Sequence, residues 1–283
     1  SNDNAGFLAY VKLCLEQKDT LRSAQECIEF ARQNDWQKRF ESFAAACRKQ
    51  VPKVSVIVLT YNNEAINRQC IESILTQTAY PAFELIVVDN ASTDGTRKYL
   101  QELDAQHRQN VKIIQNDENL GFAGGNNCGI KAADGEYVIL LNNDTYVTRG
   151  WMTNLVKHLE NDRSFAMCNP VTNSIGNESK IEASYHSAAE LAQFAYSYTK
   201  THMGEEYHRV DRLPLFATII RKRVLDQVGL LDETYKVGMF EDDDFTEKVL
   251  RAGYRIVIAE DAFVHHMQRA SFCKLEDKKK KKI

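Results

Sequence analysis

The chain has 283 residues, of which 43% are hydrophobic and 27% are charged, and its formal net charge is -3. This composition suits one large or two small folded domains and excludes the overall basic field of nucleic-acid-binding domains. No apolar run approaches the ~20 residues of a membrane helix, no signal peptide opens the chain, and the seven cysteines form no CxxC pair. We therefore expect reduced thiols and a cytoplasmic location.

Residues 1–50 are predicted to form a separate helical segment. From residue 3 onward this segment has one glycine and no proline, and its apolar residues recur at helical spacing. A break is expected near Lys18-Asp19-Thr20, with Thr20 capping the next helix. We expect an appendage packed on the main domain, with the end of an upstream helical repeat array as the alternative. Ser1-Asn2 is typical of an expression remnant, so the chain is expected to belong to a larger multidomain protein.

Residues 51–272 are predicted to form the main domain, in which strands alternate with helices. Predicted strands cover 54–60, 83–89, 111–114, 136–141, 215–220 and 254–259. Predicted helices cover 66–75, 96–103, 123–133, 151–161, 187–199, 224–228 and 245–252. This alternation favours an α/β fold with a mostly parallel, twisted sheet flanked by helices. Apart from its one helix, the stretch 162–212 is predicted to be irregular.

Residues 273–283 end in five lysines, Lys278 to Lys282. Such a run of like charges is typical of a disordered tail. Peripheral contact with an anionic membrane, at its inner face, is the alternative.

Polar residues follow three predicted strands, at Thr60 to Asn63, at Asp89 to Gly95 and at Asn142 to Asp144. The carboxyl ends of parallel strands share one edge of the sheet, where ligands bind. A nucleotide across this edge could bond its base to Asp89 and its ribose to Thr60 or the Asp144 region. The Asn-Asn-Asp run would suit a cation that bridges a diphosphate, although an ordinary turn is the alternative.

A glycine-rich turn from Asn119 to Asn127 opens a predicted helix. Glycines let a backbone approach a ligand closely, and the start of a helix suits an anion. The turn is not GxGxxG and lacks the lysine of a P-loop, so a nicotinamide cofactor and a P-loop nucleotide site are both excluded.

Four acids, Glu241 to Asp244, come directly before the predicted helix 245–252. Helix-dipole complementation rarely needs four acids, and clustered like charges call for a cation or another partner. One of these carboxylates could be a general base. His265 and His266 follow the last predicted strand and are as consistent with metal ligands as with ordinary histidines.

These motifs, in this order and spacing, resemble the family 2 inverting glycosyltransferases of GT-A fold over about residues 53–271. The glycine-rich turn is most similar to the branch of rhamnosyl- and galactofuranosyltransferases. The resemblance implies transfer of a hexosyl or deoxyhexosyl group from a nucleotide-diphosphate sugar in polysaccharide biosynthesis. It also implies Mg²⁺ or Mn²⁺ and an acceptor that is a glycan, a lipid-linked glycan or another hydroxyl compound.

The resemblance also implies roles for individual residues. It implies contacts with the nucleotide sugar at Thr60, Asn62, Asp89, Asp94, Gly121, Asn126 and Asn143. Asp144 and His265 are implied as metal ligands, with His266 as the fallback, and Asp242 is implied as the base. Asn142 replaces the first aspartate of the usual DxD motif, which would weaken metal binding. Asn62-Asn63 replaces the more usual Asn-Glu, which affects the expected preference for sugar or base.

Two other functions stay open. A GT-A module that binds nucleotide or glycan without catalysis, inside a larger assembly, would explain Asn142 and the helical segment. A nucleotidyltransferase shares the sheet and the metal, but it would carry a glycine-rich basic loop where this chain has Tyr61-Asn62-Asn63. Residues 170–215 are expected to bind the acceptor as a mobile lid, and their aromatic side chains either stack on sugars or simply pack.

Overall fold

The computed structural model describes residues 4–16, 24–48, 50–106, 110–235 and 240–267. The predicted break at Lys18-Asp19-Thr20 and the basic tail 273–283 lie outside the described residues. The chain divides into two compact units, Ser1–Val51 and Pro52–Ile283. Among the described helices, none is both long enough and apolar enough to cross a membrane.

The first unit consists of helices α1 (Asn4–Glu16), α2 (Ala24–Gln33) and α3 (Trp36–Arg48), as the helical spacing predicts. Oδ1 of Asp35 accepts a hydrogen bond from the backbone N–H of Lys38 at 2.8 Å, which caps the start of α3. Large apolar side chains on these helices are exposed, with Trp36 at 86%.

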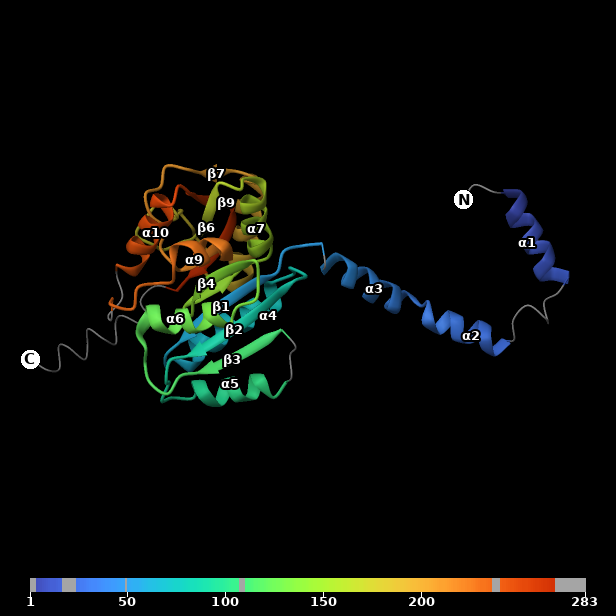
Figure 1. Cartoon of the computed structure of the whole chain (residues 1–283), viewed down its shortest axis with the longest axis horizontal. Helices are drawn as coiled ribbons and strands as arrows, with labels where there is room; N and C mark the ends of the chain where they lie inside the picture. The colour runs from blue at the N-terminus through green and yellow to red at the C-terminus, as the bar shows by residue number, and fades with distance from the viewer. Residues whose placement is uncertain (1–3, 17–23, 49, 107–109, 236–239, 268–283) are drawn as a thin grey trace, which may run out of the picture. The chain divides into compact units, whose positions relative to one another are not determined.

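The second unit is built on one nine-stranded sheet in the order β3-β2-β1-β4-β8-β6-β9-β5, with β7 also paired to β9 (Figure 1). The strands are β1 (Val54–Thr60), β2 (Phe83–Asp89), β3 (Val111–Gln115), β4 (Tyr137–Asn142), β5 (Thr145–Val147), β6 (Phe165–Val171), β7 (Glu206–Tyr207), β8 (Ala217–Arg221) and β9 (Arg255–His266). Strands β1 to β4 pair in parallel, as does β6 with β9, whereas β8 runs antiparallel to β4 and β6.

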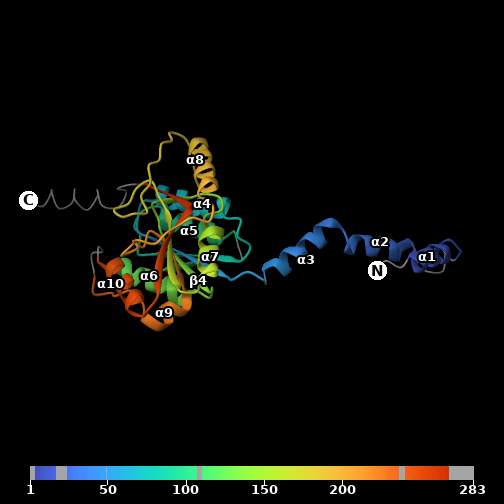
Figure 2. The same cartoon turned by 90° about the horizontal axis from the view of Figure 1, so that it is seen from above.

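Helices cover both faces of this sheet. They are α4 (Glu64–Gln77), α5 (Thr96–Asp104), α6 (Gly121–Ala132), α7 (Trp151–Asn161), α8 (Ala188–Thr201), α9 (Lys222–Val228) and α10 (Glu241–Arg251). Helices α6, α9 and α10 lie on one side of the sheet, and α4 and α7 lie on the other (Figure 2). Right-handed crossovers explain why α4 and α6 lie on opposite sides, because the chain steps from β1 to β2 in one direction along the sheet and from β3 to β4 in the other.

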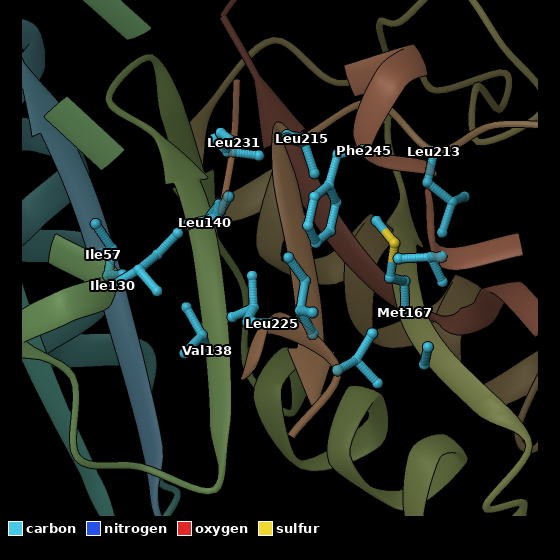
Figure 3. Close-up of a cluster of buried hydrophobic side chains, with 14 of the residues drawn as sticks. Ile57, Ile130, Val138, Leu140, Met167, Leu213, Leu215, Leu225, Leu231 and Phe245 are labelled. Atoms are coloured by element: carbon cyan, nitrogen blue, oxygen red, sulfur yellow. The ribbon is translucent and has the colours of Figure 1, made fainter. Parts of the chain in front are cut away.

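The core on the α6 side is a cluster of aliphatic and aromatic side chains from the sheet and its helices (Figure 3). Two glycines bring α6 unusually close to β1. A Cβ atom on Gly129 would lie 2.4 Å from Cγ2 of Ile57, and one on Gly125 would lie 2.4 Å from Cδ1 of Leu59. These two glycines of the predicted glycine-rich turn and its helix therefore serve close packing of helix on sheet.

Several elements differ from the sequence-based expectation, and the short strands β5 and β7 were not predicted. Strand β6 lies within the stretch predicted to be irregular, and all seven of its residues are buried. The strand was not predicted because it contains Asn169 and Pro170, and proline has no N–H to donate to a neighbouring strand. In the structure, Pro170 lies at a register shift in the pairing with β9. Helix α10 begins at Glu241 and includes the four acids, and β9 continues through His266 instead of ending at residue 259.

Candidate active site

The ends of β1, β2 and β4 meet at one edge of the sheet. Thr60 is in register with Asp89, and Leu59 is in register with Asn142. The backbone of Asn62 and Asn63 has positive φ (56° and 64°), a conformation that asparagine tolerates better than most residues. Such conformations are common where a chain must present groups at a functional edge.

The carboxylate of Asp89 is fully buried and already holds several donors. Its Oδ1 accepts from the hydroxyls of Ser92 and Thr60, the latter at 3.3 Å. Its Oδ2 accepts from the N–H of Ser92 at 3.1 Å and from Nε of Arg97 at 3.0 Å. The described contacts therefore make Asp89 the anchor of the loop that follows β2.

Asn62 and Asp94 connect the loops after β1 and β2. Oδ1 of Asn62 accepts from the N–H of Thr93 at 2.8 Å. The carboxylate of Asp94 accepts from the N–H of Glu64 at 3.1 Å and from that of Thr96 at 2.9 Å, which caps α4 and α5. Burial raises the pKa of Asp94, but these hydrogen bonds outweigh burial, so its pKa is lowered overall.

The glycine-rich turn is held by Asn90, a residue that was not predicted to contribute. The side chain of Asn90 makes four hydrogen bonds to this turn and the residues before it, with Asn116, Asn119, Leu120 and Gly121. Gly121 has φ of 75°, which favours glycine.

Two asparagines of α6 are also buried. Nδ2 of Asn126 donates within the helix to the carbonyl of Phe122. Asn127 exchanges hydrogen bonds with the backbone of Leu231 and donates to Glu233 at 2.9 Å. Asn127 thus ties α6 to the segment that precedes α10.

Asn67 of α4 is a further residue that the sequence interpretation missed. Its buried amide contacts the ends of β1 and β4 and the start of α5 through Asn62, Asn143 and Thr96. A signal was present, because Asn67 occupies the inward helical face that Cys70, Ile71 and Ile74 share.

Asp144 lies against His266. Nε2 of His266 is 3.2 Å from Oδ1 of Asp144, and the ring stacks on Phe216 with centroids 5.5 Å apart. Nδ1 of His266 lies 2.8 Å from the carbonyl of Ser174, which fixes that nitrogen as the donor and leaves Nε2 facing the carboxylate. Burial lowers the pKa of His266, but the hydrogen bond and charge of Asp144 outweigh it, so its pKa is raised.

His265 faces a different partner, so the side chain that lies beside Asp144 is that of the fallback, His266. Nδ1 of His265 lies 2.6 Å from the hydroxyl of Tyr185. Adjacent residues of a strand point to opposite faces, so only one of the two histidines can meet Asp144. Burial, with the nearby His266, lowers the pKa of His265, which favours a neutral ring that accepts a hydrogen bond from the Tyr185 hydroxyl.

The donor set of Asp144 and His266 fits a divalent cation that takes its other ligands from elsewhere. Within the described ranges, no three His, Cys, Asp or Glu side chains come together as a metal site. The pair would supply one carboxylate oxygen and one imidazole nitrogen with a fixed tautomer, and diphosphate oxygens and water suit the remaining positions.

Asp242 differs from its acidic neighbours in the first turn of α10. Asp243 and Asp244 pair with Arg212 at 2.9 Å and with Lys248 at 2.6 Å. Oδ2 of Asp242 instead accepts from the N–H of Leu215 at 3.1 Å. Burial, reinforced by the neighbouring acids and opposed by this hydrogen bond, raises the pKa of Asp242 to about 7. A carboxylate of this kind can take a proton near neutral pH.

Two adjacent residues connect Asp242 to the Asp144–His266 pair. Leu215 holds the Asp242 carboxylate, and the ring of Phe216 stacks on His266. The carbonyl of Phe216 also accepts from the N–H of Asn142 at 2.7 Å. The candidate base and the candidate metal ligands are therefore held by one short segment before β8.

The expected acceptor segment contains both packed and exposed aromatic side chains. Tyr185 and Phe194 pack edge-on against Phe263 of β9, and Tyr198 stacks on Phe194. Tyr196 on the other face of α8 is 62% exposed. Packing therefore accounts for most of the aromatic residues in this segment.

A family model described as glycosyl transferase family 2 matches residues 55–229, which is more than half of the chain. Among curated proteins, the chain is similar to glycosyltransferase AglE of Haloferax volcanii, with 25% identity over 221 residues, 77% of this chain and 68% of that protein. An uncharacterized glycosyltransferase of Haemophilus influenzae is 38% identical over 117 residues, 41% of this chain and 36% of its own length. The chain thus spans about a third to two thirds of these relatives.

Solved structures with the same fold include two that contain Mn²⁺. GalNAc-T7 with UDP, GalNAc and Mn²⁺ superimposes with a TM-score of 0.63 at 15% identity, over 78% of this chain and 45% of that chain. Mannosyltransferase PcManGT from Pyrobaculum calidifontis, in complex with GDP-Man and Mn²⁺, gives a TM-score of 0.60 at 20% identity, over 78% and 58% of the two chains. The expected mixed α/β architecture with a mostly parallel sheet and flanking helices is confirmed.

Proposed function

The chain belongs to glycosyl transferase family 2, and from this premise we propose that it moves a sugar from a nucleotide-diphosphate donor to an acceptor hydroxyl with inversion. The observation that carries the proposal is the partly buried carboxylate of Asp242, whose pKa is raised to about 7 beside the segment that supports Asp144 and His266. Named glycosyltransferases among its relatives support the same reaction class.

Asp242 is proposed as the general base. It would accept the proton of the acceptor hydroxyl as that oxygen attacks the anomeric carbon. The bond from this carbon to the diphosphate oxygen breaks, and its electron pair leaves with the nucleoside diphosphate. One displacement of this kind inverts the anomeric centre, and general-base assistance typically contributes ~10²–10⁴-fold in rate.

Asp144 and His266 are proposed to hold Mg²⁺ or Mn²⁺. The bound cation would offset the negative charge that develops on the leaving diphosphate. Asn142 offers a neutral amide where a second carboxylate is usual. Asp144 and His266 would therefore be the main protein ligands of the cation. The presence of Mn²⁺ with a nucleotide or nucleotide sugar in both structural neighbours supports this proposal.

The nucleotide is proposed to lie across the ends of β1, β2 and β4. The residues that would face the nucleotide at this edge are Thr60, Asn62, Asn143 and Gly121, with Asn126 and Asp94 on either side. Because the described partners of Asp89 already fill its carboxylate, we infer that Asp89 contributes by holding the loop after β2 in place.

The acceptor is proposed to be a glycan or lipid-linked glycan that enters beside residues 170–215, in a role in polysaccharide biosynthesis. The similarity to rhamnosyl- and galactofuranosyltransferases, a hexosyl or deoxyhexosyl group, a cytoplasmic location and membership of a larger chain remain parts of this proposal. Residues 1–50 are proposed to be a helical segment that is distinct from the catalytic domain.

A donor screen tests the proposed function. Thermal unfolding is measured with Mn²⁺ and a panel of UDP-, GDP- and dTDP-sugars, and stabilising donors are then assayed for turnover. Glycosyl transfer or donor hydrolysis releases a nucleoside diphosphate. Release of pyrophosphate would indicate a nucleotidyltransferase, and binding without turnover would indicate the non-catalytic module.

A further inference from the structure

The polar side chain of Asn67 is fully buried in α4. Nδ2 donates to the carbonyl of Asn62 at 2.8 Å and to Oγ1 of Thr96 at 3.0 Å. Oδ1 accepts from Nδ2 of Asn143 at 2.6 Å. Both N–H donors and the oxygen of the amide are therefore in use, which offsets the cost of burying it.

The three partners of Asn67 come from three different segments of the candidate site. Asn62 follows β1, Thr96 opens the helix after β2, and Asn143 follows β4. Asn143 is also the neighbour of Asp144 in the turn that leads to β5. One side chain thus ties the loops proposed for the nucleoside to the turn proposed for the metal.

Stability of α4 alone does not account for an amide at this position. Cys70, Ile71 and Ile74 share the buried face of α4 with Asn67, so an apolar side chain would suit the packing. All three side-chain hydrogen bonds of Asn67 go to residues at the ends of strands or the start of α5. The amide of Asn67 therefore fixes the relative positions of the segments at that edge of the sheet.

We propose that Asn67 is a positioning residue, which acts through Asn143 to hold the Asp144 carboxylate in the orientation that binds the cation and the donor diphosphate. This inference rests on the proposed function. Replacing a residue that orients a metal ligand through hydrogen bonds typically lowers metal affinity by about 10- to 100-fold.

Calorimetry of UDP, GDP and dTDP binding, each with and without Mn²⁺, tests the proposal on the whole chain. The nucleotide that binds wild type most tightly is used for Asn67→Leu, Asn143→Ala and the double variant. We expect each single variant to weaken Mn²⁺-dependent binding by about 10- to 100-fold. The double variant should bind the nucleotide no more weakly than whichever single variant has the lower affinity, because both changes remove the same hydrogen bond between Asn67 and Asn143.

Ser55→Ala is the matched control, at the opposite end of β1. Oγ of Ser55 donates to Glu84 at 2.6 Å and accepts from the N–H of Gly135 at 2.9 Å, so this variant also loses buried hydrogen bonds. It should lower the melting temperature and leave nucleotide affinity unchanged. A parallel loss of affinity in Ser55→Ala would show a general stability effect and overturn the inference.

The remaining outcomes separate the inference from the proposed function. Wild-type affinity in Asn67→Leu, or additive losses in the double variant, would overturn the positioning role and leave the proposed function standing. If Asn67→Leu does not fold, Asn143→Ala decides the point, because unchanged Mn²⁺-dependent affinity there contradicts the proposal. Failure of wild type to bind any of the three nucleotides with Mn²⁺ would overturn the proposed function, and the inference with it.

Discussion

Nε2 of His266 lies 3.2 Å from Oδ1 of Asp144, although 122 residues separate them in the chain. The antiparallel pairing of β5 with β9 brings them together, because Thr145 is in register with His266. The bond from Nδ1 of His266 to the carbonyl of Ser174 then aims Nε2 at the carboxylate. The sheet itself therefore assembles the two proposed metal ligands.

His266→Gln is expected to weaken Mn²⁺-dependent nucleotide binding by at least about tenfold, because it removes the imidazole nitrogen beside Asp144. His265→Gln is the matched control, since His265 contacts Tyr185 and lies on the opposite face of β9. Isothermal titration with and without Mn²⁺ measures both. The assignment is wrong if His265→Gln causes the larger loss.

Asp242→Asn is expected to stabilise the protein at pH 8. Burial raises the pKa of Asp242 from 3.8 to about 7, so the folded state disfavours ionisation and stability falls as pH rises from about 4 to 7. The asparagine variant avoids this loss, which amounts to at most about 4 kcal/mol for a shift of that size. Urea unfolding at pH 4 and pH 8 checks it: an equal difference between variant and wild type at both pH values contradicts the shifted pKa.

Gly129→Ala is expected to reduce the free energy of unfolding by about 1–3 kcal/mol, because its Cβ would lie 2.4 Å from Cγ2 of Ile57 in a packed core. Gly176→Ala is the control, since a Cβ there meets nothing within 4 Å. Denaturant unfolding compares them. Similar effects at the two positions would show that α6 does not approach β1 as closely as described.

His158 is expected to give the fold a pH dependence near neutrality. Its ring is buried, and Nε2 lies 2.7 Å from Oδ1 of Asp261, while Nδ1 contacts Glu206. Burial lowers the pKa of His158, but the two acids outweigh burial and raise it. The protonated ring of His158 therefore stabilises the folded state. This contribution is complete below about pH 6.5, the ordinary pKa of histidine, and is lost as pH rises through the pKa of His158 in the folded state.

His158→Gln tests this expectation, because glutamine keeps polar contacts but cannot titrate. Wild type should lose stability relative to His158→Gln as pH rises above about 6.5. Parallel curves of unfolding free energy against pH would show that folding does not raise the pKa of His158.

The sequence was most informative where one physical signal dominated. Strands β1 and β2 have the predicted bounds, because runs of mostly β-branched and aliphatic residues end at Thr60 and Asp89. Strand β6 was missed, because a buried asparagine and a proline at a register shift interrupt that signal. The orientation of His265 and His266 followed from the extension of β9, which long-range pairing with β5 and β6 determines.

The supporting amides show a second limit. Asn67, Asn90 and Asn127 are buried and connect the loops of the site, yet their partners lie up to 106 residues away in the chain. An inward-facing asparagine on a helix marks such a residue, but only the tertiary fold identifies its partners.

The most direct test of the proposed reaction is Asp242→Asn, assayed with the donor that the screen identifies and an acceptor that wild type uses. The rate of nucleoside diphosphate release should fall by about 10²–10⁴-fold, while donor affinity with Mn²⁺ stays unchanged. The wild-type rate should decline below about pH 7, where Asp242 becomes protonated. Wild-type turnover in Asp242→Asn would contradict the account.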